Sequence, residues 1–159
     1  MSRAVLESVE FMSREKAVKL PGKNNVAFIS IHSSKGVPAG LKPGWGGVIH
    51  LAFDDVVPGL DPRTGLVTLG GANIVPFNES HAKKLLEFVD GLHECINHVY
   101  VHCDAGISRS AAVARFLSVR HACPLIGDDR YANSHVLSVL NKVDRTYERF
   151  FGSQFRIER

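Results

Sequence analysis

The sequence predicts an α/β fold, a single domain in which a central, mostly parallel sheet is flanked by helices. Short β-rich apolar runs, such as residues 25–31, alternate with stretches of helical periodicity, such as residues 78–96. The length of 159 residues suits one domain with a sizeable core. No repeat, low-complexity segment or linker divides the chain, so we expect one domain over residues 1–159.

The first part of the chain predicts a helix between two strands. Residues 4–11 alternate weakly and indicate either a first strand or an irregular entry. Ser13 fits as the N-cap of a short helix over residues 14–20, which a Pro-Gly pair then ends. The β-branched run at 25–31 predicts a central strand.

A glycine- and proline-rich loop is predicted over residues 32–47. It contains Trp45, which we expect to cover the edge of the core, with a substrate-contacting role as the alternative. Residues 48–53 carry apolar side chains on both faces, which is typical of a buried strand. This strand runs directly into Asp54 and Asp55.

The middle of the chain is predicted to be irregular and then helical. Residues 56–76 are punctuated by proline and glycine, with a small strand or hairpin expected at 65–69. Asn78 or Ser80 then caps an amphipathic helix. Its apolar face comprises Ala82, Leu85, Leu86, Val89, Leu92 and Ile96.

The chain is predicted to end in one more helix. Residues 124–132 form a connector, and Asn133 fits as the N-cap of a helix that Gly152 closes. Its buried stripe comprises Val136, Leu137, Leu140, Val143, Tyr147 and Phe151.

An apolar strand at 99–101, a tight loop at 103–109 and a helix at 110–122 together predict a phosphate site. The backbone N–H groups of such a loop gather around an anion, and the helix dipole adds positive potential. That potential favours the nucleophilic thiolate form of Cys103. The planar guanidinium of Arg109 can grip two oxygens of a tetrahedral anion. These residue types in this spacing indicate a phosphatase.

The motif His102-Cys103-x5-Arg109-Ser110 resembles the signature of cysteine-dependent protein tyrosine phosphatases, nearest to the compact dual-specificity-like group. The resemblance extends over about residues 26–140, but only the Cys103 loop is specific. It implies metal-independent hydrolysis of phosphotyrosine in proteins through a phosphocysteine intermediate, with phosphoserine and phosphothreonine left open. It implies no cofactor.

The loop supplies the predicted substrate contacts through the N–H groups of Asp104, Ala105, Gly106, Ile107, Ser108 and Arg109. Gly106 allows the loop to curl tightly. The resemblance implies that the Ser110 hydroxyl donates to the sulfur of Cys103 as the thiolate leaves, and helix capping is a compatible alternative role. It also implies that His102 orders the loop. Strand alternation places His102 on the face opposite Cys103.

A phosphate ester also needs an acid for the leaving oxygen. Asp54 and Asp55 end a predicted strand, and the resemblance aligns best with Asp55. Alternation puts Asp55 on the side of Phe53 and turns Asp54 away. Asp61 is the rival, because residues 56–76 lengthen the usual spacing between acid and nucleophile.

Other residues narrow the function. The acidic Asp104, with Ala105 and Ile107, offers no partner to a second phosphate, so we do not expect phosphoinositide substrates. A rhodanese-like sulfurtransferase and a phosphopeptide-binding pseudophosphatase are the alternatives, with RNA 5′-triphosphatase activity more remote.

Composition bounds the partners. The net charge is +3 and no cationic run exceeds Lys83-Lys84, so we expect no nucleic acid partner and place both lysines on a solvated helix face. No apolar run approaches the ~20 residues of a membrane span. The expected partner is therefore a phosphorylated protein or peptide.

The cysteines and histidines indicate the cellular compartment and whether a metal site is expected. Three cysteines, Cys95, Cys103 and Cys123, suit a reducing compartment and predict a cytoplasmic protein. Cys95 or Cys123 is also a candidate disulfide partner for an oxidised Cys103. The histidines show no metal-ligand spacing, so we expect no metal.

Overall fold

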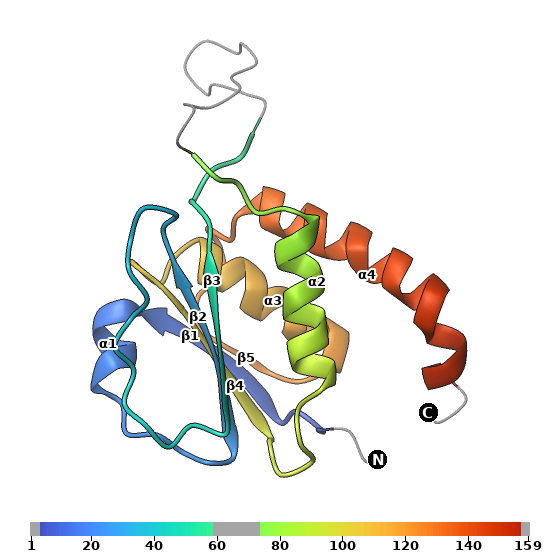
Figure 1. Cartoon of the computed structure of the whole chain (residues 1–159), viewed down its shortest axis with the longest axis horizontal. Coiled ribbons are helices and arrows are strands. Elements are labelled where there is room, and N and C mark those ends of the chain that lie inside the picture. Colours follow the sequence, from blue (N-terminus) through green and yellow to red (C-terminus); the bar gives the residue numbers. More distant parts are fainter. Residues whose placement is uncertain (1–3, 59–73, 157–159) are drawn as a thin grey trace.

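The computed structural model describes residues 4–58 and 74–156, with side chains described as far as Tyr147. It contains a five-stranded sheet in which every pairing is parallel, in the order β3-β2-β4-β1-β5 (Figure 1). The strands are β1 (Ser8–Ser13), β2 (Val26–His32), β3 (Gly47–Ala52), β4 (His98–Cys103) and β5 (Leu125–Ile126). The helices are α1 (Arg14–Lys19), α2 (Glu79–Asp90), α3 (Arg109–His121) and α4 (Ser134–Arg156). The predicted fold class is confirmed.

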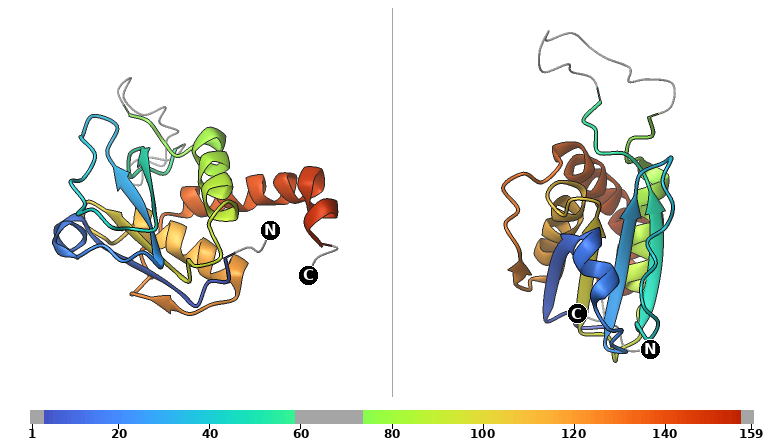
Figure 2. Two further views of the ribbon diagram at one scale, coloured as in Figure 1. Left: turned by 60° about the horizontal axis from the view of Figure 1, so that its bottom comes forward. Right: turned by 90° about the vertical axis from the view of Figure 1, so that its left-hand side faces the viewer.

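Helices cover the two faces of the sheet unequally. Helices α2, α3 and α4 lie on one face, and the short α1 lies on the other (Figures 1 and 2). The main core therefore forms between the sheet and the three longer helices. A smaller cluster beside α1 comprises Met12, Ala17 and Phe28 with Leu20, Leu41, Trp45 and Tyr100.

Trp45 belongs to this smaller cluster. Its ring meets Phe28 edge-on at 4.9 Å and Tyr100 at 5.7 Å, measured between ring centroids. Its neighbour Gly46 donates a backbone hydrogen bond to Val26 at the first residue of β2. Trp45 thus lies at the opposite end of the sheet from Cys103. Its expected place at the core edge is confirmed.

Strand order fixes where a site can form. β4 is the central strand, between β2 and β1, and its last residue Cys103 pairs with Ser13 at the end of β1. The chain then passes through residues 104–108 into α3. Because parallel strands end at the same edge, the segments that follow β2 and β3 meet this loop there.

Side-chain caps begin three of the helices as predicted. Ser13 Oγ accepts the N–H of Lys16 at 3.2 Å. Asn78, rather than Ser80, caps α2, and His81 completes a capping box. Asn133 Oδ1 accepts the N–H of Val136 at 3.0 Å at the start of α4.

Two predicted helix ends are wrong. Helix α2 ends at Asp90, where the N–H of Gly91 bonds to the carbonyl of Glu87. Leu92 and Ile96 therefore lie beyond the helix, although both are buried in the main core, in the segment that leads from α2 into β4. Helix α4 runs through Gly152 to Arg156. A single glycine costs a helix only about 1 kcal/mol, which does not stop it.

The strand predictions also need correction. β3 is an edge strand rather than a buried one: its Val48 is 41% exposed, and His50 is exposed as well. Among the described helices, none covers the face of β3 that turns away from α2 (Figures 1 and 2). β1 begins at Ser8 rather than at residue 4.

Residues 124–132 are not a simple connector, because the two-residue β5 pairs with β1 there. Two residues are too few to show a strand period. The hairpin predicted at 65–69 and the rival acid Asp61 lie outside the described residues.

Candidate active site

The predicted nucleophile lies at the carboxyl edge of the sheet. Cys103 is only 2% exposed, and its Sγ lies 3.1 Å from Ser110 Oγ and 3.3 Å from the backbone N of Gly106. Both neighbours can donate to sulfur. The sulfur therefore lies within hydrogen-bonding distance of one side-chain hydroxyl and one backbone N–H of its own loop.

The loop that follows Cys103 packs tightly against the end of β1. Gly106 has φ of +72°, and a Cβ there would overlap the backbone of Met12 and Ser13. The N–H of Arg14 bonds to the carbonyl of Asp104 at 3.2 Å. Both the left-handed conformation and the close approach require glycine at position 106.

Ser108 and Ser110 have different surroundings. The N-cap of α3 is Ser108, whose side chain makes no capping bond, and the helix begins at Arg109. The capping alternative for Ser110 is therefore wrong. The Ser110 hydroxyl is fully buried and contacts Cys103 Sγ instead. The predicted role of Ser110 beside the departing sulfur requires this placement, and the role itself stays a prediction.

His102 lies on the opposite side of β4 from Cys103, as alternation predicts, and its ring packs near Phe28. Burial lowers the pKa of His102, so the ring is neutral at neutral pH. Its Nδ1 lies 3.2 Å from the carbonyl of Cys103, and its Nε2 lies 2.6 Å from Ser30 Oγ. A carbonyl only accepts, so Nδ1 carries the proton and Nε2 accepts from Ser30. These bonds tie the start of the loop to β2.

Arg109 is 6% exposed and its guanidinium contacts three segments. Nη1 donates to the carbonyl of Phe53 at 2.9 Å and to Ser33 Oγ at 3.3 Å, while Nη2 donates to Asp104 Oδ2 at 3.1 Å. Its buried Nε has no hydrogen-bond partner among the described residues. A buried N–H donor without a partner costs free energy, and an anion in the loop would satisfy it.

Asp104 is the acidic residue of the loop. Burial alone would raise the pKa of its carboxyl, but hydrogen bonds from Arg109 and Ser33, together with the charges of Arg109 and Arg14, hold that pKa below the usual value. The ionised carboxylate accepts from Ser33 Oγ at 3.1 Å and pairs with Arg109. Asp104 thus holds the guanidinium of Arg109 beside the loop.

The two candidate acids face different ways. Asp55 Oδ1 accepts from Ser108 Oγ at 2.7 Å and from Asn133 Nδ2 at 2.8 Å, so this carboxyl lies at the Cys103 loop. Asp54 instead accepts from Ser34 N at 3.0 Å, from Ser34 Oγ at 2.6 Å and from Val75 N at 2.8 Å. The structure therefore brings Asp55, and not Asp54, to the nucleophile's loop.

Asp54 is an anchor for neighbouring segments. Burial alone would raise the pKa of Asp54, but hydrogen bonds from Ser34 and Val75 outweigh it and hold the pKa below the usual value. A carboxyl that stays ionised has no proton to donate near neutral pH. Its hydrogen bonds instead join Ser34, which follows β2, to Val75, which shortly precedes α2.

Three contacts were not predicted from the sequence, those of Ser33, Ser34 and Asn133. The two serines directly follow β2, the parallel neighbour of the Cys103 strand, and that position is the signal that could have identified them. Asn133 was predicted only as a helix cap. Nothing in the local pattern indicates that its amide reaches Asp55, 78 residues away in sequence.

Neither of the other cysteines is placed to pair with Cys103. Cys123 follows α3, which starts at the Cys103 loop and spans 13 residues, or roughly 20 Å. Cys95 precedes β4, so the length of that strand separates it from Cys103. Disulfides need Cα atoms within about 7 Å. Burial also raises the pKa of the Cys123 thiol, which lowers its reactivity.

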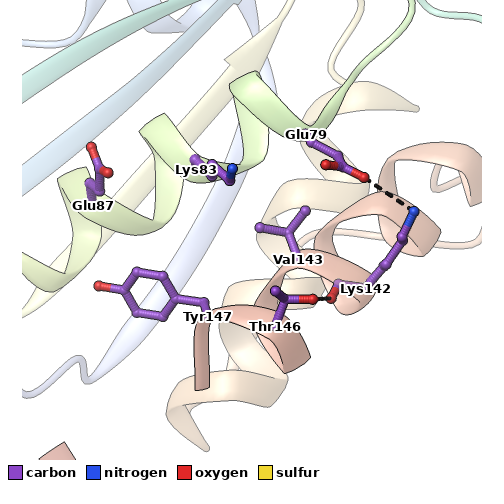
Figure 3. A pocket seen from close by; sticks show the side chains of 7 residues that line it. All are labelled: Glu79, Lys83, Glu87, Lys142, Val143, Thr146 and Tyr147. Carbon is purple, nitrogen blue, oxygen red and sulfur yellow. Dashed lines mark hydrogen bonds and ion pairs between the residues drawn. The ribbon is translucent and has the colours of Figure 1, made fainter. Parts of the chain in front are cut away.

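A groove of about 460 Å³ lies elsewhere, between α2 and α4 (Figure 3). The Lys142–Glu79 ion pair, at 3.1 Å, closes one end of it, and Val143 and Tyr147 line its floor. It includes none of the predicted site residues. The exposed Lys83, beside Lys84, confirms that this pair occupies a solvated face of α2.

Residues 4–58 and 74–156 contain neither a metal-binding cluster nor a helix that could span a membrane. No group of three His, Cys, Asp or Glu side chains there is arranged to hold a metal ion. No helix in this part of the chain has the length and apolarity needed to cross a membrane. Comparison with family models, curated proteins and solved structures found no match to the chain.

Proposed function

We propose that the protein is a metal-independent phosphatase that hydrolyses phosphotyrosine in proteins, with Cys103 as nucleophile, Arg109 as phosphate ligand and Asp55 as general acid. The observation that carries this proposal is the convergence of these three side chains on one loop. Cys103 Sγ meets two donors, Arg109 has a buried Nε without a partner in the described structure, and Asp55 bonds to Ser108.

In the first step the thiolate of Cys103 attacks phosphorus and forms an S–P bond. The P–O bond to the leaving group breaks, and Asp55 gives its proton to the departing oxygen. The loop N–H groups and the Arg109 guanidinium stabilise charge on the equatorial oxygens. Asp104, which pairs with Arg109, keeps the guanidinium at the loop before the substrate arrives.

In the second step a water molecule attacks the phosphocysteine. Asp55, now ionised, takes a proton from the water, the S–P bond breaks, and inorganic phosphate leaves. Ser110 Oγ, 3.1 Å from Cys103 Sγ, donates a hydrogen bond to the departing thiolate. The neutral His102 carries out no proton transfer here and holds the loop through the carbonyl of Cys103.

The loop composition supports a protein substrate that carries one phosphate. Ile107 is 50% exposed and offers an apolar contact to an aromatic ring. Asp104 adds a negative charge beside Arg109, which disfavours a second phosphate. Phosphoserine and phosphothreonine remain further candidate substrates. We place the enzyme in the cytoplasm, because its three cysteines are free and free thiols suit a reducing compartment.

The test is hydrolysis of para-nitrophenyl phosphate in EDTA by the wild type, Cys103→Ser and Asp55→Asn. We expect wild-type turnover, none in Cys103→Ser, and retained binding of a phosphate analogue in that variant. Asp55→Asn should slow poor leaving groups far more than Asp54→Asn does. Turnover that survives Cys103→Ser would overturn the covalent mechanism. Thiosulfate turnover without phosphatase activity would favour a sulfurtransferase.

A further inference from the structure

Asn133 makes hydrogen bonds with every polar group it has. Its N–H bonds to the carbonyl of Ser108 at 3.1 Å, and its own carbonyl accepts from Leu137 at 3.2 Å. Its side-chain Oδ1 accepts from Val136 N, while Nδ2 donates to Asp55 Oδ1 at 2.8 Å and to the carbonyl of Val56 at 3.2 Å. The residue is only 5% exposed.

These bonds fix the orientation of the Asn133 amide. The carboxylate of Asp55 and the carbonyl of Val56 can only accept from it, so the NH₂ group must face them. The N–H of Val136 can only donate, so the amide oxygen must face α4. A rotated amide would lose all three bonds, and burial would make each loss costly.

Asn133 therefore joins three segments that are far apart in sequence. It caps α4, bonds to the backbone of the Cys103 loop at Ser108, and holds the carboxyl of Asp55. Ser108 Oγ and Asn133 Nδ2 both donate to the same oxygen of Asp55, Oδ1. The proton that a general acid carries then belongs on Oδ2.

We infer that Asn133 is a positioning residue for the general acid: its amide holds Asp55 Oδ1 so that Oδ2 delivers its proton to the leaving group above Cys103. This inference rests on the proposed function and deepens it. It gives the N-terminus of α4 a part in proton transfer as well as in folding. Asn133 itself touches neither the substrate nor the reacting atoms.

The inference predicts a loss that depends on the leaving group. Asn133→Ser keeps a good helix cap but removes the donor to Asp55. We expect kcat/KM for phenyl phosphate, a poor leaving group, to fall about 10-fold, because kcat/KM reports the acid-assisted first step, acid catalysis typically contributes 10²–10⁴-fold, and a misplaced acid loses part of that contribution. With para-nitrophenyl phosphate, whose leaving group needs less protonation, kcat/KM should fall less than about 3-fold.

The chain offers a matched control. Asn78 caps α2 as Asn133 caps α4, with Oδ1 accepting the N–H of His81 at 3.1 Å, and it lies outside the Cys103 loop. Asn78→Ser should leave kcat/KM for both substrates unchanged. If Asn133 only stabilised its helix, the two variants would behave alike, and that result would overturn the inference.

A second variant keeps the inference testable if Asn133→Ser proves unstable. Asn133→Asp keeps both the volume and the helix cap, but it replaces the donor with an oxygen that repels Asp55. We again expect a loss of kcat/KM selective for phenyl phosphate, measured at a temperature at which the variant is fully folded; a general loss of stability would lower the rates for both esters alike. If Asp55→Asn shows the leaving-group effect and neither Asn133 variant does, the inference fails while the proposed function stands. If the wild type hydrolyses neither ester, the proposed function fails.

Discussion

Asp54 and Asp55 are adjacent in the chain, yet their surroundings give them opposite parts. Asp54 accepts three hydrogen bonds from Ser34 and Val75, whereas Asp55 accepts two at the Cys103 loop. Strand alternation predicts that the two side chains point apart. It does not identify their partners, because those come from loops that pattern reasoning treats only as connections.

Asp54 makes stability depend on pH. Its pKa is lower in the folded protein than its ordinary value of 3.8, so the stability it contributes is fully present above that value. It is lost as the pH falls below that value toward the folded pKa. In urea titrations, the gap in unfolding free energy between wild type and Asp54→Asn should stay constant above about pH 5 and shrink by about pH 3. A gap that widens in acid would contradict this assignment.

Replacing Arg109 with lysine should impair binding and turnover together. Lysine keeps the charge but loses the planar fork, and it cannot reach Phe53, Ser33 and Asp104 at once. We expect kcat/KM for para-nitrophenyl phosphate to fall about 100-fold, with KM raised and kcat lowered. Arg115→Lys, a change on the exposed side of α3, is the control and should have little effect. A fall of less than threefold in kcat/KM would mean that Arg109 does not bind the phosphate group.

At the scale of elements, the sequence predicts the strand, loop and helix around Cys103 because each follows from a local pattern. The N-caps of the helices could be predicted equally well, because Ser13, Asn78 and Asn133 each precede a stretch of helical periodicity. The C-terminal ends of the helices could be predicted less well. Leu92 and Ile96 continue the apolar periodicity beyond α2, because buried positions outside a helix can extend its pattern.

The Cys103 loop depends on β1 as well as on its own sequence. Gly106→Ala would place a Cβ against the backbone of Met12 and Ser13 at a left-handed φ. We expect it to destabilise the fold by at least about 2 kcal/mol and to displace the loop, which abolishes phosphate binding. Chemical denaturation and binding of vanadate, a phosphate analogue, measure the two effects.

Gly40 provides the control for that substitution. A Cβ added there meets no atom within 4 Å, and its φ is not in the left-handed region. Gly40→Ala should therefore leave stability and vanadate binding essentially unchanged. If Gly106→Ala changed stability and vanadate binding as little as Gly40→Ala, the loop would tolerate a side chain at position 106.

At the scale of the whole molecule, α/β alternation predicts the parallel sheet and the edge where the site forms. Strand order was not predicted, because it depends on long-range pairing that leaves no local signal. The exposed Val48 illustrates the difficulty: an apolar run indicates a strand but does not say whether that strand lies at the centre or at the edge. The hydrogen bond from Asn133 to Asp55 could not be predicted either, because it depends on tertiary packing between distant segments.

The three longer helices are joined by one arginine. Arg120 of α3 forms a two-pronged pair with Asp90 of α2, at 2.8 and 3.1 Å, and bonds to Asp144 of α4 at 3.1 Å. Its side chain is 11% exposed. Arg120→Ala leaves two half-buried carboxylates near each other, so we expect a loss of about 2 kcal/mol or more in unfolding free energy.

The control is Arg130→Ala, which removes an equally short but exposed pair with Asp128. Solvent screens such a pair, so chemical denaturation should show little change. Similar losses for Arg120→Ala and Arg130→Ala would mean that the helix layer does not depend on the buried cluster.

The phosphocysteine is the central claim, and mass spectrometry tests it most directly. Asp55→Asn, quenched in acid during turnover of para-nitrophenyl phosphate, should accumulate the intermediate, because it forms with a good leaving group and then lacks the base that activates water. We predict one phosphoryl group on Cys103 and none in the Asp55→Asn, Cys103→Ser double variant. A phosphoryl group on any other residue, or turnover that leaves Cys103 unmodified, would contradict the mechanism.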